Sequence, residues 1–309
     1  MPGPYAHLTA ALEVAVKPVL SRIDAMPSRA VAALLRWVTY CELGAVCPDL
    51  PYMGLTDARS MHWSDLMHHQ GSGAFLKAGI ARLQSMTGDR RDKGAAWLMG
   101  FASHVVMDVA VHPVINLRVG PYEENKSRHR SCEMHQDVYI YQRLGLGPMH
   151  LAEHFRSVGG PARERFHRLS VDPDIETLWR DLLREVYPDA YQDRRPRIDY
   201  WFRWYRRAID KVAEEATLLP FARHVGANLG LVYPTEDEVD SSFIVDLQTP
   251  NGNTASYDQV FDHAKAWLAT VWGWIGSAIY DHDTRYLSRL TDWDLDTGLD
   301  PDGAMILWS

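Results

Sequence analysis

The sequence is poor in cysteine and has no excess of basic residues. Its three cysteines (Cys41, Cys47 and Cys132) are odd in number and form no C-x-x-C pair. This argues against a disulfide framework and weakly favours a reducing compartment. The sequence contains 32 Lys and Arg residues and 40 Asp and Glu residues, which gives a net charge of −8. Because binding to duplex nucleic acid requires a basic face, duplex nucleic acid is not expected as a partner.

Long hydrophobic runs are also missing. The most membrane-like stretch, AWLATVWGWIGSAIY (266–280), contains an internal Gly and Ser and falls short of the roughly 20 apolar residues that cross a bilayer. We therefore expect no transmembrane segment. The first residues carry no basic leader and place Glu13 and Lys17 inside their apolar part. A signal peptide is not predicted, and the expected location is the cytoplasm.

Several common catalytic motifs are absent, and one unusual helix is present. There is no H-E-x-x-H, no P-loop, no G-x-G-x-x-G and no G-x-S-x-G. The stretch Trp97–Pro113 (WLMGFASHVVMDVAVHP) is apolar except for His104, Asp108 and His112, spaced i, i+4, i+8. That spacing places the three side chains on one face of a helix. A helix that is apolar all round is buried, so these groups are predicted to enter the core.

Two interpretations of this face are open. Each residue could be a satisfied core residue, a histidine bonded to a carbonyl or an aspartate paired with arginine. However, no Lys or Arg lies within the stretch, and an uncompensated buried charge is very costly. A metal cation is therefore the favoured partner. Pro113 cannot continue a helix, so we expect the face to end at His112.

A second helix, from His129 to Tyr141, repeats the pattern. His129, Glu133 and Asp137 are again spaced i, i+4, i+8, whereas His135 lies about 200° round the helix from Glu133 and is excluded from that face. A solvated polar stripe is the alternative. Facing the first helix, these residues would complete a set of three histidines and three acids, enough for two ions. The chemistry that best matches such a set is a multi-metal hydrolytic centre.

Two further segments hold candidate ligands. Asp49 lies in Cys47-Pro48-Asp49-Leu50-Pro51, which is expected to be rigid and extended. Its alternative role is that of a turn residue after a helix. Residues 56–73 are polar, are expected to form a loop, and contain His62, His68 and His69.

Helical periodicity dominates the remaining chain. Helices are predicted over residues 8–20, 28–46, 74–86, 160–169, 175–186, 197–224 and 257–290. Ser28 and Asp92 are expected to be helix caps. Residues 226–256 are expected to form a long loop with one hairpin.

The domain prediction is a single all-α domain over residues 1–309, because neither a repeat nor a low-complexity linker is present. Its metal-site core would be residues 1–140, followed by a helical C-terminal half, residues 141–309. In that half, DYWFRWYRR (199–207) could be a lipid- or base-stacking surface, but an amphipathic helix that lays its arginines over the core is favoured. Trp293 and Trp308 are expected to anchor the acidic tail.

Four motifs in the N-terminal half resemble one known family. The specific one is GFASHVVMDVAVHP (100–113), supported by RHRSCEMHQDVY (128–139), GAVCPDLPY (44–52) and AHLTAA (6–11). The family is the bacterial zinc-dependent phospholipase C family, an all-helical fold related to the zinc nucleases that cut single strands. The resemblance covers roughly residues 6 to 140.

The resemblance implies ligands for three zinc ions. The first zinc would be bound by Asp49, His68, His104 and Asp108. The second would be bound by His112, His129 and Glu133, and the third by His7, with Asp108 bridging to it. His62 and His69 compete with His68, which the context WSDLMH favours. Asp137 would orient a ligand histidine. Secreted family members complete the third site with an N-terminal Trp, whereas this chain begins Met-Pro-Gly-Pro-Tyr. Two or three zinc ions are therefore expected.

The function implied by the resemblance is hydrolysis of a phosphodiester or phospholipid headgroup, with release of an alcohol such as diacylglycerol. Asp49 is a candidate general base as well as a ligand. A nuclease or phosphomonoesterase on the same scaffold is one alternative, and a non-catalytic, zinc-stabilised binding protein is another. No run of alternating strands follows residue 250, so an accessory lipid-binding β-sandwich is not expected.

Overall fold

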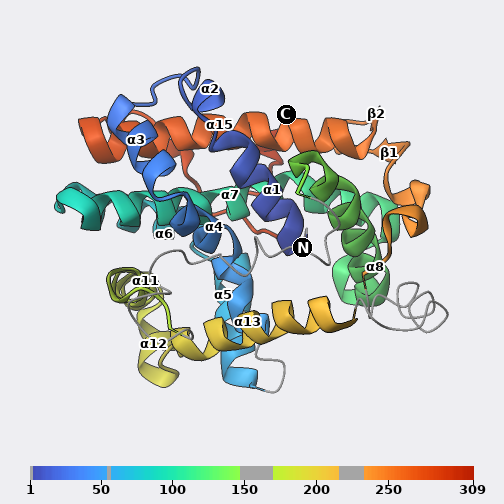
Figure 1. Cartoon of the computed structure of the whole chain (residues 1–309), viewed down its shortest axis with the longest axis horizontal. Helices are drawn as coiled ribbons and strands as arrows, with labels where there is room; N and C mark the ends of the chain where they lie inside the picture. Colours follow the sequence, from blue (N-terminus) through green and yellow to red (C-terminus); the bar gives the residue numbers. More distant parts are fainter. Residues whose placement is uncertain (1–2, 54–56, 147–169, 216–232) are drawn as a thin grey trace.

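The described structure is almost entirely helical. The computed structural model describes residues 3–53, 57–146, 170–215 and 233–309 (Figure 1). Within these ranges the only strands are β1 (Leu247–Gln248) and β2 (Thr254–Ala255), which pair antiparallel. The all-α prediction is confirmed, and so is the single hairpin expected in the loop before the last long helix.

The helices fall into three groups along the chain. The first group is α1 (Pro4–Val14), α2 (Lys17–Leu20), α3 (Ser28–Arg36), α4 (Val38–Val46), the 3-10 helix η1 (Cys47–Met53), α5 (Ala58–His69) and α6 (Ser72–Gln84). The second is α7 (Gly88–Val119), α8 (Tyr122–Tyr141) and η2 (Gln142–Leu144). The third is α11 (Pro173–Val186), α12 (Pro188–Asp193), α13 (Ile198–Glu215), η4 (Glu236–Glu238), η5 (Ser241–Phe243), α15 (Tyr257–Asp281), η6 (Leu287–Arg289) and η7 (Ile306–Trp308).

Helix α7 is the central helix, around which several other helices pack. Every residue from Gly94 to Ile115 is buried, as the apolar stretch predicted. Helix α15 runs beside α7 along the long dimension of the molecule, and α1, α4, α6 and α8 pack on the other sides of α7 (Figure 1). By length and composition α7 could cross a membrane, but its 18-residue apolar window is 100% buried inside the protein. That burial is characteristic of a core helix.

The prediction that α7 ends at Pro113 is wrong, because the helix continues to Val119. Pro113 has no N–H to donate to the carbonyl of Val109, four residues earlier. The space beside the Val109 carbonyl is occupied by Gly298, near the C-terminus. A Cβ added to Gly298 would lie 2.7 Å from the Val109 oxygen and 2.6 Å from Pro113 Cγ. Tertiary packing therefore supports the helix across its proline.

Two helices predicted as continuous are broken. The helix expected over residues 8–20 ends at Val14, and the short α2 begins with Pro18 in its first turn. The helix expected over residues 28–46 breaks at Trp37, where the chain bends by 81° between Ser28–Arg36 and Val38–Tyr52. Neither expected cap is correct: Ser28 is already inside α3, and Asp92 lies within α7, which begins four residues earlier.

Two segments expected to be non-helical are helical. Residues 47–53 form η1 instead of an extended segment, and most of the expected loop at 56–73 is the helix α5, capped by the Asp57 side chain. The buried face of α5 includes Ser60 and Ser64. Ser60 accepts a hydrogen bond from the Trp201 indole, and Ser64 donates one to the Pro48 carbonyl. Because these core positions are polar, the sequence shows little apolar periodicity there.

The C-terminal half largely follows the prediction. Helix α11 matches residues 175–186, and α13 covers the first part of 197–224, while 160–169 and the rest of that helix lie outside the described residues. Helix α15, expected to reach residue 290, ends at Asp281. The next residue, His282, takes a left-handed conformation. Within α13, Trp201, Phe202 and Tyr205 are buried, which supports the amphipathic interpretation. Trp293 and Trp308 are buried anchors, as expected, and the three cysteines are free.

Two glycines let α4 and α7 touch at the backbone. A Cβ on Gly44 would lie 2.0 Å from the Trp97 carbonyl oxygen, and one on Gly100 would lie 1.9 Å from the Cys41 carbonyl oxygen. Such close approach is possible only without side chains. The crossing places the end of α4, and η1 after it, against the face of α7 that carries His104.

We predict that Gly100→Ala lowers the free energy of unfolding by about 2–3 kcal/mol, because overpacked backbone cannot yield without shifting a helix. The matched variant is Gly79→Ala, whose Cβ meets only the side-chain end of Leu98. It should cost clearly less, since Leu98 can rotate and alanine favours helix. Urea unfolding of both variants tests this, and equal losses would contradict the proposed crossing constraint.

Candidate metal centre

Four ligand-type side chains from three elements converge on one buried point. On α7, His104 Nε2 lies 3.1 Å from Asp108 Oδ2. From α5, His68 Nε2 lies 3.7 Å from the same oxygen and 3.3 Å from Asp49 Oδ1, which η1 supplies. Asp49 Oδ1 is also 3.8 Å from His104 Nε2. These are the residues assigned to the first zinc, and the ligand atoms of Asp49, His68 and His104 all fall within 4.8 Å of one another.

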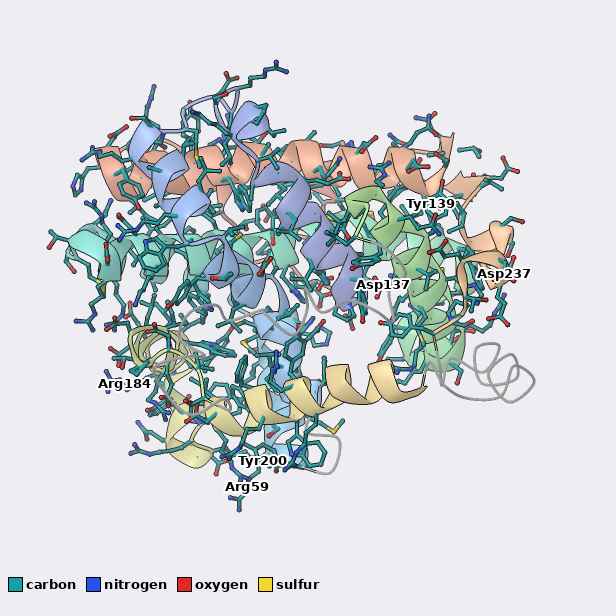
Figure 2. All side chains as sticks on the ribbon, in the orientation of Figure 1. Arg59, Asp137, Tyr139, Arg184, Tyr200 and Asp237 are labelled. Atoms are coloured by element: carbon teal, nitrogen blue, oxygen red, sulfur yellow. The ribbon has the colours of Figure 1, made fainter. Side chains whose placement is uncertain are left out.

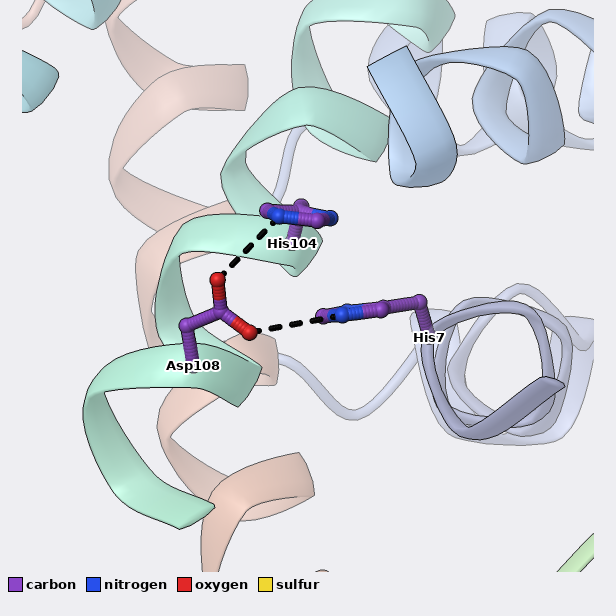
Figure 3. A group of neighbouring side chains, drawn as sticks. All are labelled: His7, His104 and Asp108. Atoms are coloured by element: carbon purple, nitrogen blue, oxygen red, sulfur yellow. Dashed lines mark ion pairs between the residues drawn. The ribbon is translucent and has the colours of Figure 1, made fainter. Parts of the chain in front are cut away.

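Helix α1 brings a third imidazole to the other side of Asp108. His7 Nε2 lies 3.3 Å from Asp108 Oδ1, and its ring stacks on that of His104 with centroids 4.0 Å apart (Figure 3). Asp108 thus faces His104 and His68 with one oxygen and His7 with the other. His7, His104 and Asp108 form the second group whose ligand atoms lie within 4.8 Å. The resemblance implied a bridging role for Asp108, and this geometry is compatible with that role.

Backbone carbonyls fix the tautomers of the two central histidines. His104 Nδ1–H donates to the Ala45 carbonyl at 2.9 Å, and His68 Nδ1–H donates to the Ser64 carbonyl at 2.8 Å. Both Nε2 atoms therefore carry lone pairs when the rings are neutral, yet they lie only 3.4 Å apart. Two lone pairs that face each other at this distance require a cation or a proton between them. A histidine that binds a metal through one ring nitrogen usually donates the N–H of its other ring nitrogen to a carbonyl or a similar acceptor.

The unsatisfied polar atoms also fit a cation. Both oxygens of Asp108 are buried without a hydrogen-bond partner, and so are Asp49 Oδ1 and both ring nitrogens of His7. The side chain of Asp108 is 0% exposed. Leaving such groups unpaired in the core would cost several kcal/mol. Imidazole nitrogens and carboxylate oxygens in this arrangement are the ligand types that zinc prefers.

The pKa shifts show how the cluster is balanced by protons. Burial opposes ionisation of Asp108, but His104 and His112 hold the pKa of that carboxyl well below its usual range. Burial would lower the pKa of His68, but Asp49 and Asp108 outweigh it and raise the pKa to about 9. A proton on His68 thus compensates Asp49 first and Asp108 second at neutral pH. Because zinc binds the neutral imidazole, metal uptake should displace that proton.

Asp137 has a different role from the one expected. It bonds none of the candidate ligand histidines directly but accepts hydrogen bonds from the backbone N–H of Ala6 at 2.8 Å, that of Tyr5 at 3.4 Å and the Tyr233 hydroxyl at 2.9 Å. Figure 2 labels it on α8, beside the first turn of α1. Burial raises its pKa to about 7. Asp137 therefore anchors the start of the helix that carries His7.

The residues assigned to the second zinc are placed nearby but less tightly. His129 Nδ1 lies 3.8 Å from Glu133 Oε1, and His129 Nε2–H donates to the Gly120 carbonyl at 2.6 Å. His112 donates through Nδ1–H to the Leu295 carbonyl, and its buried Nε2 has no hydrogen-bond partner. Burial lowers its pKa to about 4, so the ring is neutral at pH 7. Among the described residues, this set does not gather within 4.8 Å as the first two groups do.

The structure also separates the competing histidines. His68 belongs to the cluster, whereas His69 pairs with Asp294 at 2.9 Å and His62 belongs to neither group of ligand atoms. His135, excluded by its helical angle, accepts a hydrogen bond from the Asp240 N–H. Sequence reasoning missed Leu295, because its contact with His112 is made by a carbonyl group that every residue possesses.

Comparison with known proteins adds one family. The profile described as zinc dependent phospholipase C matches residues 6–214, more than half of the chain. No curated protein and no solved structure matches. The matched range contains all eight residues proposed as ligands and ends before the segment that contains Leu295.

We predict that Asp108→Ala removes about two equivalents of zinc, since both of its oxygens face ligand groups, whereas His7→Ala removes about one. Asp65→Ala is the control, because that carboxylate bonds the Tyr52 hydroxyl and lies in neither group. Elemental analysis after zinc-supplemented expression and dialysis measures all three. Equal zinc content in Asp108→Ala and the control would show that Asp108 is not a bridging ligand.

Proposed function

Because this chain belongs to the zinc-dependent phospholipase C family, we propose that it hydrolyses the phosphodiester bond of a phospholipid headgroup with two or three bound zinc ions. The observation that carries the proposal is the pair of unpartnered, fully buried oxygens of Asp108, each facing an imidazole nitrogen. Asp49, His68, His104 and Asp108 would hold the first ion. His112, His129 and Glu133 would hold the second, and His7 with Asp108 the third.

Zinc in such a centre supplies a Lewis acid for the phosphoryl oxygens and lowers the pKa of a bound water toward neutrality. The protein residues then have distinct tasks. His104 and His68 are held in one tautomer by carbonyls, so they remain ligands throughout. Asp108 would contribute the negative charge that retains the cations. The stretch of α7 around it, residues 97–113, contains no arginine or lysine.

Asp49 is the residue best placed to move a proton. Its side chain is 8% exposed, whereas those of His68, His104 and Asp108 are 0% exposed. It is therefore the least buried side chain of the cluster. His104 and His68 hold the pKa of Asp49 below its usual range against the effect of burial. The carboxylate is ionised at neutral pH and can accept a proton from the attacking water as a general base.

Hydrolysis then breaks the bond between phosphorus and the oxygen of the alcohol. The oxygen of water forms the new P–O bond and its proton passes to Asp49. The leaving alkoxide takes up a proton from solvent to leave as an alcohol such as diacylglycerol, and Asp49 returns its proton to solvent. The products are this alcohol and a phosphorylated headgroup.

The test of the reaction is hydrolysis of a short-chain phosphatidylcholine, compared with p-nitrophenyl phosphate and a single-stranded oligonucleotide. We expect the phospholipid to be the best substrate, with His104→Ala and Glu133→Ala each lowering kcat/KM by at least about 10³. His62→Ala should retain the wild-type rate, because His62 lies outside the ligand groups. Preference for the monoester or the oligonucleotide would identify one of the alternative hydrolases, and zinc binding without turnover would indicate a binding protein.

A second prediction separates ligation from proton transfer at Asp49. Asp49→Asn keeps an oxygen for the metal but is a far weaker proton acceptor, so kcat should fall by about 10²–10⁴ while most of the zinc is retained. Asp49→Ala should lose zinc as well. The measurements are kcat and zinc content of each variant. A wild-type kcat in Asp49→Asn would rule out the general-base role.

A further inference from the structure

A segment near the C-terminus crosses the helices that carry the ligands. Residues 290–298, here called the strap, lie beyond the matched range of the family profile. Leu290, Trp293 and Leu295 are buried. The strap packs closely on both sides: a Cβ on Gly73 of α6 would lie 2.4 Å from the Leu290 oxygen, and one on Gly298 would meet Pro113 of α7.

A single residue of the strap bonds two proposed ligands of different ions. The Leu295 N–H donates to the His68 carbonyl at 2.8 Å, and the Leu295 carbonyl accepts from His112 Nδ1–H. His68 lies on α5 and His112 on α7, so one peptide unit on each side of Leu295 ties the two helices together. The hydrogen bond to His112 also decides its tautomer. With the proton on Nδ1, the lone pair is on Nε2, the buried atom that has no hydrogen-bond partner.

A turn closed by the Asp294 side chain holds the strap in place. Asp294 Oδ1 accepts from the N–H of Asp296 at 3.1 Å and from the N–H and hydroxyl of Thr297 at 2.9 Å each. Its other oxygen pairs with His69 Nδ1 at 2.9 Å. Asn116 on α7 donates to the Asp296 carbonyl at 2.8 Å. The turn therefore joins α5 and α7 on either side of Leu295.

We propose that the strap is a positioning element for the metal centre, which holds the proton of His112 on Nδ1 and sets the spacing between His68 and His112. The proposal rests on the second zinc site of the proposed function, but it concerns a state of His112 that exists before zinc binds. A strap that only covers the core would stabilise the protein without affecting this tautomer.

The chain offers a matched pair of glycines for the test. Gly298 and Gly303 both have left-handed backbone, with φ of 71° and 77°. Alanine at either position introduces the same backbone strain. Only Gly298→Ala also drives a Cβ into Pro113 and the Val109 carbonyl, because nothing lies within 4 Å of a Cβ at Gly303. Gly298→Ala should therefore lift the strap from α7 near His112.

The first measurement uses the full-length, zinc-free protein. In wild type and Gly303→Ala, the ¹⁵N chemical shifts of the His112 ring should show the proton on Nδ1, and in Gly298→Ala they should show a mixture of tautomers. The second measurement is a Zn²⁺ titration against a competing chelator. The zinc site that contains His112 should lose about 10- to 100-fold in affinity in Gly298→Ala, as expected when a group that orients a ligand is lost, and stay unchanged in Gly303→Ala.

A second pair covers the case in which Gly298→Ala does not fold. Asp294→Ala removes the acceptor that closes the turn after Leu295, and Asp300→Ala removes an equivalent acceptor, which binds the N–H groups of Asp302 and Ala304 outside the strap. The same two measurements should change in Asp294→Ala and not in Asp300→Ala. The strap proposal is overturned if His112 keeps its tautomer and zinc affinity in the folded strap variants. If both change but the wild type hydrolyses no phosphodiester, the strap proposal stands and the proposed function fails.

Discussion

The structure depends on a negative charge that the fold takes fully out of water. Asp108 is 0% exposed, ionised, and surrounded by imidazoles whose nitrogens point at its oxygens without hydrogen bonding to them. Protons can balance this charge only in part, since His112 is held neutral by burial while His68 is held protonated. A divalent cation would compensate the buried charge and would take the place of the His68 proton beside His104 Nε2. The buried groups of this cluster are therefore of the kind that can bind a metal ion.

Helix packing converts this constraint into a geometry. Glycines at the crossing of α4 and α7 bring the Ala45 carbonyl to His104, and the chain that leaves α4 then delivers Asp49 to the same point. Asp137 acts similarly at the other end, since its bonds to the first turn of α1 place His7 against Asp108. The positions of these side chains follow from contacts with backbone groups, so the first cluster is assembled without an ion.

Sequence reasoning succeeded where a regular helix carries the information. The spacing of His104 and Asp108 on a buried helix predicted their shared face, and the all-α class followed from periodicity. It failed where tertiary contacts replace local rules. Ser60 and Ser64 concealed the buried face of α5, because their polar atoms are satisfied by Trp201 and Pro48. The passage of α7 through Pro113 depends on packing from a residue almost two hundred positions away.

The role of the strap shows most clearly what a ligand motif leaves out. The family match ends at residue 214, yet the orientation of His112 is set by a carbonyl at position 295. Since every residue possesses a carbonyl, no pattern of residue types could reveal this contact. It is specific only because Gly298 fits beside Pro113 and Asp294 closes the turn, which together present that one carbonyl to the ring. The ligands of such a centre are determined by side chains, but their alignment is determined by the path of the backbone around them.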